Sequence, residues 1–196
     1  MDAILTLAAV VVVVATMLAV VGYRLLVSGA LTVDTGWGRR SRPLGPQIVR
    51  VAATRDTVYD LLAQPYVGRV TRALQEKVQV LERGTDMVVA AHRTNVGRGR
   101  VAVTVESVRF QPPERIDFRL LRGPVPHVVE HFLVVSESPG LTRIEYGGEL
   151  ATDGWKPGAW WGRLVANKWE ATVAATLSAV KTEAERHTTT RRPETR

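Results

Sequence analysis

The sequence predicts an α+β protein in which an antiparallel sheet of about seven strands is covered by one long C-terminal helix, behind a single N-terminal membrane segment. Three observations support this fold class. The chain begins with an uninterrupted apolar run, its middle alternates apolar and polar residues between closely spaced turn signals, and its C-terminal part carries apolar residues at three- and four-residue steps. Strands that follow one another this closely, without helices between them, pair as antiparallel hairpins.

Composition excludes several classes of protein. The chain has 196 residues, of which 45% are hydrophobic and 23% charged, and these values exclude wholesale disorder. The absence of cysteine excludes a disulfide scaffold, thiolate metal sites and a cysteine nucleophile. More than half of the net charge of +7 lies in residues 1–45 and 188–196. Because a nucleic-acid-binding domain concentrates its charge on the folded part, we expect no nucleic-acid partner.

The apolar run Ala3–Tyr23 carries no charged side chain. As a helix it is about 31 Å long, which matches the hydrocarbon core of a bilayer. Ser28 and Ala30 could pass for a signal-peptide cleavage site, but no basic residue precedes the run and it exceeds the length of a signal-peptide core. The nearby arginines all follow it, which predicts a cytoplasmic C-terminal side. We therefore expect residues 1–27 to be a single-pass anchor in the plasma membrane.

Three further segments follow the anchor. Residues 28–45 are rich in Gly, Ser and Arg and predict a linker near the membrane surface. Trp37 in this linker either contacts lipid headgroups or is a chance tryptophan on a solvated chain. Residues 46–187 form the predicted soluble domain, and residues 188–196 a disordered tail.

The domain is expected to begin with a strand, Gln47–Ala53, and a helix that has Thr54 as its N-cap and ends at Pro65. A short second helix is predicted over Val67–Leu74. The strands expected next are Glu76–Arg83, Met87–Asn95, Arg100–Phe110, Arg115–Leu121, Pro126–Ser136 and Leu141–Ala151.

A helix over Pro157–Glu185 completes the domain. Its opposite face is charged, so one apolar stripe must face the sheet. The residues of this stripe are Trp161, Val165, Trp169, Thr172, Val173, Thr176 and Val180.

This order of elements resembles the helix-grip fold of the START-like (SRPBCC) superfamily, which includes polyketide cyclases and dehydrases and lipid-transfer proteins. The resemblance rests on Ala53–Leu62 after the first strand, on Pro112–Ile116, and on Gly140–Tyr146 at the start of the last strand. It covers about residues 46–186. It implies a curved antiparallel sheet wrapped around the long helix, with a cavity for an apolar ligand between them.

Three other polar patterns do not meet the requirements of a chemical site. His127 and His131 have the spacing of a metal-ligand pair on a helix, but on a strand they lie about 13 Å apart, too far to share a metal. The segment Asn95–Arg100 lacks the pattern of a phosphate-binding loop and predicts a hairpin turn. Glu130 and His131 fall on opposite strand faces and form no evident catalytic pair. We expect no catalytic residue, metal or cofactor.

The candidate ligand-binding residues are those that would line the cavity. They are Trp161, Val165, Trp169, Val173, Tyr146, Phe118, His131 and Arg119, where the tryptophans either form an aromatic wall or fill an ordinary core. The sequence predicts a membrane-tethered protein that binds an apolar or lipid-like small molecule. Two alternatives remain: a cyclase- or dehydratase-type enzyme acting on a polyketide-like substrate, and an accessory subunit of a membrane-protein complex.

Overall fold

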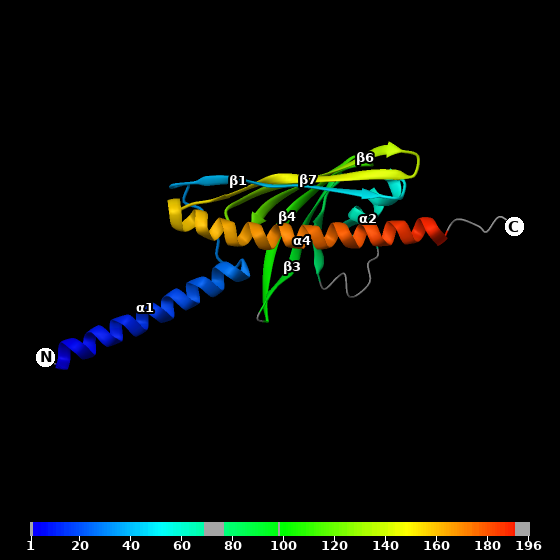
Figure 1. The fold of residues 1–196 in the computed structure, drawn as a ribbon. Coiled ribbons are helices and arrows are strands. Elements are labelled where there is room, and N and C mark those ends of the chain that lie inside the picture. The colour runs from blue at the N-terminus through cyan, green and yellow to red at the C-terminus, as the bar shows by residue number, and fades with distance from the viewer. Residues whose placement is uncertain (1, 69–76, 98, 191–196) are drawn as a thin grey trace.

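The computed structural model describes residues 2–68, 77–97 and 99–190. Seven strands form one antiparallel sheet in the order β1-β7-β6-β5-β4-β3-β2, and a long C-terminal helix lies across one face of it (Figure 1). This confirms the predicted α+β architecture. The strands are β1 (Arg40–Val51), β2 (Val78–Arg83), β3 (Met87–Gly97), β4 (Arg100–Gln111), β5 (Arg115–Arg122), β6 (His127–Ser138) and β7 (Leu141–Thr152). The helices are α1 (Asp2–Ser28), α2 (Arg55–Val67) and α4 (Trp155–Thr190).

The first strand begins at Arg40, earlier than the predicted start at Gln47. Residues 40–45, expected in the linker, therefore belong to the sheet, where they pair with the end of β7 from Thr152 onward. The pairing slips in register between Leu44 and Gln47, at a Gly-Pro step. Proline and glycine obscure the strand pattern here, yet an edge strand tolerates both.

The helix α2 starts at the predicted N-cap, since the hydroxyl of Thr54 accepts a hydrogen bond from the amide of Thr57 at 3.4 Å. It was expected to end at Pro65 but runs on to Val67. A proline disturbs the turn that precedes it, and here that turn is close to the end of the helix. The second helix predicted over residues 67–74 falls mostly outside the described residues.

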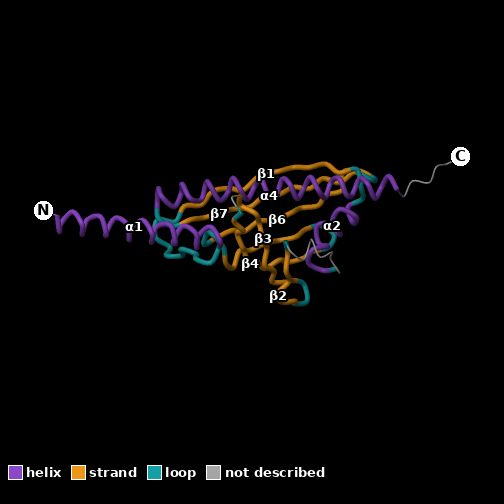
Figure 2. The backbone as a smooth tube through the Cα atoms, turned by 90° about the horizontal axis from the view of Figure 1, so that it is seen from below, coloured by secondary structure: helices purple, strands orange, loops and turns teal. Residues whose placement is uncertain are grey.

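The helix α4 is longer than predicted at both ends. Residues 188–190, expected in the tail, are helical, while residues 191–196 lie outside the described part. The helix packs on β1, β7 and α2 (Figure 2). Thr176, expected on the inner stripe, is exposed. The residues of the helix that are buried against the domain are Gly162, Ala166, Val173, Leu177 and Ala184.

Most of the helix α1 projects away from the domain, which contacts only the C-terminal part of the helix (Figure 1). Its segment Ala3–Ser28 has a mean hydropathy of 2.9, and none of its most apolar window is buried. By length and composition it is one apolar N-terminal helix of the kind found in a membrane span or a signal sequence.

Candidate functional site

Three titratable side chains lie on the inner face of the sheet, the face that α2 and α4 cover. Side chains alternate along a strand, and this alternation places His92, Glu106 and Glu130 among apolar neighbours. Glu106 is 4% exposed and Glu130 is 6% exposed. A buried carboxyl group loses its hydration, so each of them needs partners inside the protein.

Glu106 on β4 is paired with His92 on the neighbouring strand β3. The Nδ1 atom of His92 lies 3.1 Å from Oε2 of Glu106, and the hydroxyl of Thr104 donates to Oε1 at 2.6 Å. The other ring nitrogen of His92, Nε2, lies 3.0 Å from the hydroxyl of Tyr66 on α2. Both oxygens of this carboxylate and both nitrogens of the imidazole therefore have a partner.

Glu130 on β6 is held by one donor from the sheet and one from the helix. The hydroxyl of Tyr146 on β7 donates to Oε2 at 2.5 Å, and the indole Nε1 of Trp169 on α4 donates to the same oxygen at 2.6 Å. Gly148 lies opposite Glu130 in the β6–β7 register, and a Cβ there would lie 2.7 Å from the Cβ of Glu130. Only glycine allows this close approach of the strands.

A row of aromatic rings connects the two polar groups. The ring of Tyr66 lies 6.0 Å from that of Phe118, Phe118 lies 5.6 Å from Phe132, and Phe132 lies 5.5 Å from Tyr146. The first two contacts are edge-to-face, a favourable arrangement of aromatic pairs. The inner face is thus an aromatic surface with a polar group at each end.

The surroundings shift the pKa values of the two carboxyl groups in opposite directions. Burial and the negative charge of Glu106 raise the pKa of Glu130 from 4.5 to about 7, against the two hydrogen bonds from Tyr146 and Trp169. Burial opposes the charge on Glu106 too, but the charge and hydrogen bond of His92 lower the pKa of that carboxyl. The pKa of His92 is raised, because the carboxylate of Glu106 outweighs the effect of burial.

These shifts favour the charged forms of His92 and Glu106, and they place an acid that exchanges its proton near pH 7 beside the pair. Two carboxyl groups with separated pKa values are typical of sites that bind or transfer a proton. Among residues 2–68, 77–97 and 99–190, no group of three or more histidine, aspartate or glutamate side chains is arranged to hold a metal ion.

The structure brings six of the eight predicted ligand-binding residues to the helix-facing side of the sheet or to α4. Tyr146 and Trp169 contact Glu130, and Phe118 belongs to the aromatic row. Trp161 lies apart from them, where its indole donates to the carbonyl of Pro124 at 2.8 Å. The other two of the six are Val165, which is half-buried, and Val173, which is buried.

Arg119 and His131 lie on the opposite face of the sheet. Arg119 is exposed on β5, between the inward-facing Phe118 and Leu120. His131 follows Glu130 on β6, and burial and the charge of Arg115 lower its pKa. Because successive side chains of a strand point to opposite faces, neither residue reaches the space beside α4.

His92, Glu106 and Glu130 were not predicted as site residues from the sequence. Each occupies a position of an alternating strand that is otherwise apolar or small on the inward face, for example Glu130 between Val128 and Phe132. A charged residue at such a position is the signal that could have found them. The contact of His92 with Glu106 depends on the strand register, and the contact of Glu130 with Trp169 depends on how α4 packs on the sheet. The sequence pattern specifies neither.

An open groove of about 920 Å³ lies elsewhere, between α2 and the C-terminal end of α4. Seven of its eight lining residues are polar or charged, and His92, Glu106 and Glu130 are not among them. The lining residues are Thr54, Asp56, Thr57, Asp60, Leu61, Gln64, His187 and Thr188.

The sequence is similar to known proteins over a short segment only. No family model matches the chain. A segment of 62 residues is 39% identical to the sensor protein KdpD of Mycobacterium tuberculosis. The matched segment is 32% of this chain and 7% of KdpD. The chain thus spans less than a tenth of that protein.

Comparison of the structure is more informative. The Zhui aromatase/cyclase from Streptomyces sp. R1128 superimposes with a TM-score of 0.62 at 22% identity, over 76% of this chain and 96% of that one. The di-domain aromatase/cyclase BexL gives 0.59 at 20% identity, over 76% of this chain and 50% of that one. Norcoclaurine synthase from Thalictrum flavum gives 0.57 at 10% identity, over 80% and 91%. The chain therefore shares the fold of these proteins, and this fold is the helix-grip arrangement that the sequence resemblance implied.

Proposed function

We propose that this protein binds an apolar or lipid-like small molecule between the sheet and α4, with Glu130 as the group that contacts a polar atom of the ligand. The observation that carries the proposal is the position of Glu130. It is buried on an aromatic surface, and it is held from both the sheet and the helix that would enclose a ligand. Ligand sites typically combine an apolar lining with a few polar groups placed in this way.

Solved structures of the same fold support a small-molecule role. Two of them are aromatase/cyclases, and norcoclaurine synthase was crystallised in complex with dopamine and hydroxybenzaldehyde. The aromatic row from Tyr66 to Tyr146 gives this chain a surface on which a planar or acyl ligand could pack.

We further propose that α1 tethers the domain to the plasma membrane, with the C-terminal domain in the cytoplasm. A ligand of low solubility partitions into the bilayer, so a tether places the site where such a ligand is concentrated. A tag at residue 196 should survive external protease in intact cells and be degraded after permeabilisation. Degradation in intact cells, with cytoplasmic markers preserved, would show the opposite orientation.

Binding is tested with the full chain in detergent, titrated with a fluorescent fatty-acyl probe and with a fluorescent aromatic probe. We expect Glu130→Gln to change the affinity for at least one probe about tenfold. Glu149→Gln is the matched control, because Glu149 lies on β7 with a side chain that is half exposed. Absence of binding to the wild-type protein, or equal affinities of the two variants, would contradict the proposed site.

A second function, general acid–base catalysis of the cyclase or dehydratase type, is favoured by one observation. The pKa of Glu130 lies at about 7, where an acid can both donate and accept a proton at working pH. With a poly-β-ketone model substrate, the rate should follow the titration of Glu130, and Glu130→Gln should abolish turnover while binding persists. Binding without turnover of any such substrate would leave the carrier function as the better account.

A further inference from the structure

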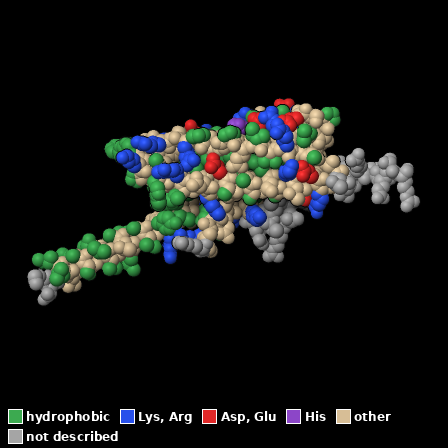
Figure 3. All heavy atoms as spheres, viewed as in Figure 1, with side chains coloured by type: hydrophobic (Ala, Val, Ile, Leu, Met, Phe, Trp, Pro, Cys, Tyr) green, Lys and Arg blue, Asp and Glu red, His purple; other side chains and the backbone are tan. Residues whose placement is uncertain are grey.

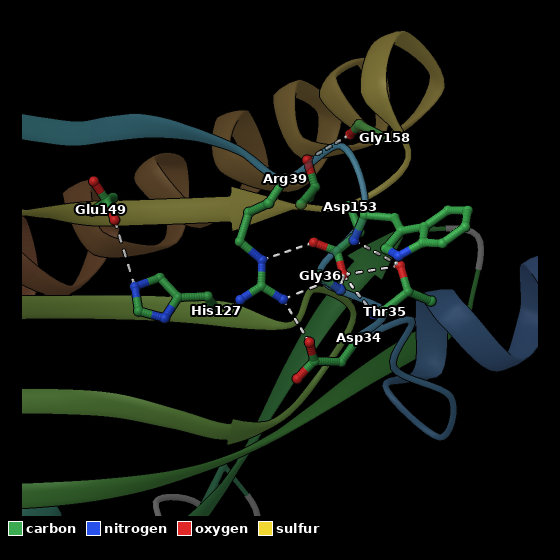
Figure 4. Close-up of polar contacts among 10 residues, drawn as sticks. Asp34, Thr35, Gly36, Arg39, His127, Glu149, Asp153 and Gly158 are labelled. Carbon is green, nitrogen blue, oxygen red and sulfur yellow. Dashed lines mark hydrogen bonds and ion pairs between the residues drawn. The ribbon is translucent and has the colours of Figure 1, made fainter.

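The segment between α1 and β1 is fixed to the domain by a buried aspartate at the start of α4. Asp153 is 7% exposed and accepts hydrogen bonds from the amides of Thr35 at 2.6 Å and Gly36 at 2.7 Å (Figure 4). The guanidinium of Arg39 donates to Asp153 through Nε at 2.8 Å and to Asp34 through Nη2 at 2.5 Å. A segment held in this way has a defined path rather than the freedom of a flexible linker.

The segment between α1 and β1 also fixes two tryptophans near each other: Trp37 of the segment itself and Trp155, the first residue of α4. The amide of Gly154 donates to the carbonyl of Trp37 at 2.8 Å, and the amide of Trp155 donates to the carbonyl of Gly38 at 3.1 Å. The ring of Trp155 lies so close to Gly38 that a Cβ there would be 2.5 Å from it. Trp37 and Trp155 are thereby kept at the same end of the domain.

The end of α1 is also packed against the domain. The ring of Tyr23 meets that of Trp161 edge-on with a centroid distance of 6.3 Å, and the guanidinium of Arg100 lies 5.4 Å from the Tyr23 ring. The hydroxyl of Thr32 donates to the carbonyl of Gly123 at 2.6 Å. These contacts set the direction in which α1 leaves the domain.

Exposed apolar and basic side chains gather at this end, and we call them the interfacial patch. Trp37 is 74% exposed and Trp160 is 58% exposed. Figure 3 shows hydrophobic and basic side chains together over the start of α4 and β1, at the end of the domain from which α1 emerges. The patch consists of Trp37, Trp155, Lys156, Trp160, Arg163 and Leu164, all exposed.

Four of these residues share one face of α4. Lys156, Trp160, Arg163 and Leu164 recur at three- and four-residue steps, so they lie along one side of the helix. Tryptophan, lysine and arginine are the residue types that favour the headgroup layer of a bilayer. The nearby carboxylates do not cancel this charge, because Asp34 and Asp153 both pair with Arg39.

We infer that the interfacial patch lies in the headgroup layer of the bilayer that α1 crosses, on an anionic lipid surface. This inference rests on the proposed tether. A protein partner is the weaker reading, because the patch is continuous with the end of α1, and a fixed helix brings that end of the domain to the membrane surface. The consequence is a domain that rests on the bilayer in one orientation.

The absence of native cysteine makes this testable by spin labelling of the full chain. Single-cysteine variants Leu164→Cys, Thr182→Cys and Val13→Cys are reconstituted in vesicles of phosphatidylcholine and phosphatidylglycerol. Leu164 belongs to the patch, Thr182 is exposed towards the far end of α4, and Val13 lies in α1. Accessibility of each label to oxygen and to a water-soluble nickel complex is then measured.

We expect the label at position 164 to be at least threefold more accessible to oxygen, relative to nickel, than the label at position 182. Lys156→Ala combined with Arg163→Ala should reduce this difference in the anionic vesicles. If the Val13→Cys label is immersed while the other two are equally exposed to water, the patch inference fails and the tether stands. A water-accessible Val13→Cys label would overturn both. A label at 164 that is shielded from both reagents only in native membranes would assign the patch to a protein partner instead.

Discussion

Asp153 and Glu130 are both buried carboxyl groups that accept hydrogen bonds through their side-chain oxygens, yet their pKa values are shifted in opposite directions. Asp153 receives two backbone amides and the guanidinium of Arg39, and the hydrogen bond from that guanidinium is the main cause of its lowered pKa. Glu130 receives only neutral donors, from Tyr146 and Trp169, and its pKa is raised.

The difference shows that burial alone does not decide the protonation of a carboxyl group. A cation in direct contact keeps Asp153 ionised, and the result is a fixed joint between two segments of the chain. Without such a cation, and with Glu106 as a negative neighbour, Glu130 retains its proton to about pH 7. The first arrangement is suited to structure and the second to ligand or proton exchange.

The largest effect is expected from removing His92, whose imidazole pairs with the buried carboxylate of Glu106. His92→Ala should lower the free energy of unfolding by about 3–5 kcal/mol, because it leaves the buried carboxylate of Glu106 without its partner. The measurement is urea unfolding of the full chain in mild detergent, followed by tryptophan fluorescence.

His127→Ala is the matched control for that variant. His127 and Glu149 also form a histidine–glutamate pair between neighbouring strands, at 3.6 Å, but both side chains are partly exposed (Figure 4). Its loss should cost less than about 1 kcal/mol. Similar costs for the two variants would mean that the buried pair is not ionised as described.

The second effect is a pH dependence caused by Glu130. Its pKa in the folded chain is raised to about 7 from 4.5, so its contribution to stability is fully present below pH 4.5 and is lost as pH rises through 7. The loss is on the order of 3 kcal/mol between pH 5 and pH 8. In Glu130→Gln this loss should vanish, and the remaining slope belongs to His92 and other groups. An unchanged profile in the variant would show that Glu130 is ionised throughout this range.

Asp153→Asn tests the other side of the comparison and should cost about 2 kcal/mol at pH 7, because charge-assisted hydrogen bonds become neutral ones. The pKa of Asp153 is lowered in the fold, so its stabilising effect is present above pH 4 and is lost as pH falls through that lowered value. The variant should therefore be less sensitive to acid than the wild type. Urea midpoints at pH 7 and at about pH 2 check both parts, and an equal drop in stability at the two pH values would contradict the assignment.

The fold could be predicted from the sequence much further than the site could. Alternation and turn residues located all seven strands, because each strand has one face towards a single core. The start of β1 was missed because Pro43 and Pro46 interrupt its pattern, although the pairing with β7 tolerates them. The site was missed because its contacts depend on the register between neighbouring strands and on side chains supplied by α2 and α4. The carboxyl of Glu130 meets Trp169 only when the sheet is folded against α4.

The smallest effect is expected from removing one of the two neutral hydrogen-bond donors to Glu130, the indole of Trp169. Trp169→Phe keeps an aromatic ring on α4 but removes the indole N–H that donates to Oε2 of Glu130 at 2.6 Å. That hydrogen bond lowers the pKa of the carboxyl, so its loss should raise the pKa further above 7, at a cost of about 1 kcal/mol at neutral pH. The carboxyl stretching band of Glu130, assigned by its absence in Glu130→Gln, should then titrate at higher pH in infrared spectra. If the midpoint falls instead, the indole does not donate to an ionised Glu130, and burial and Glu106 alone would account for the retained proton.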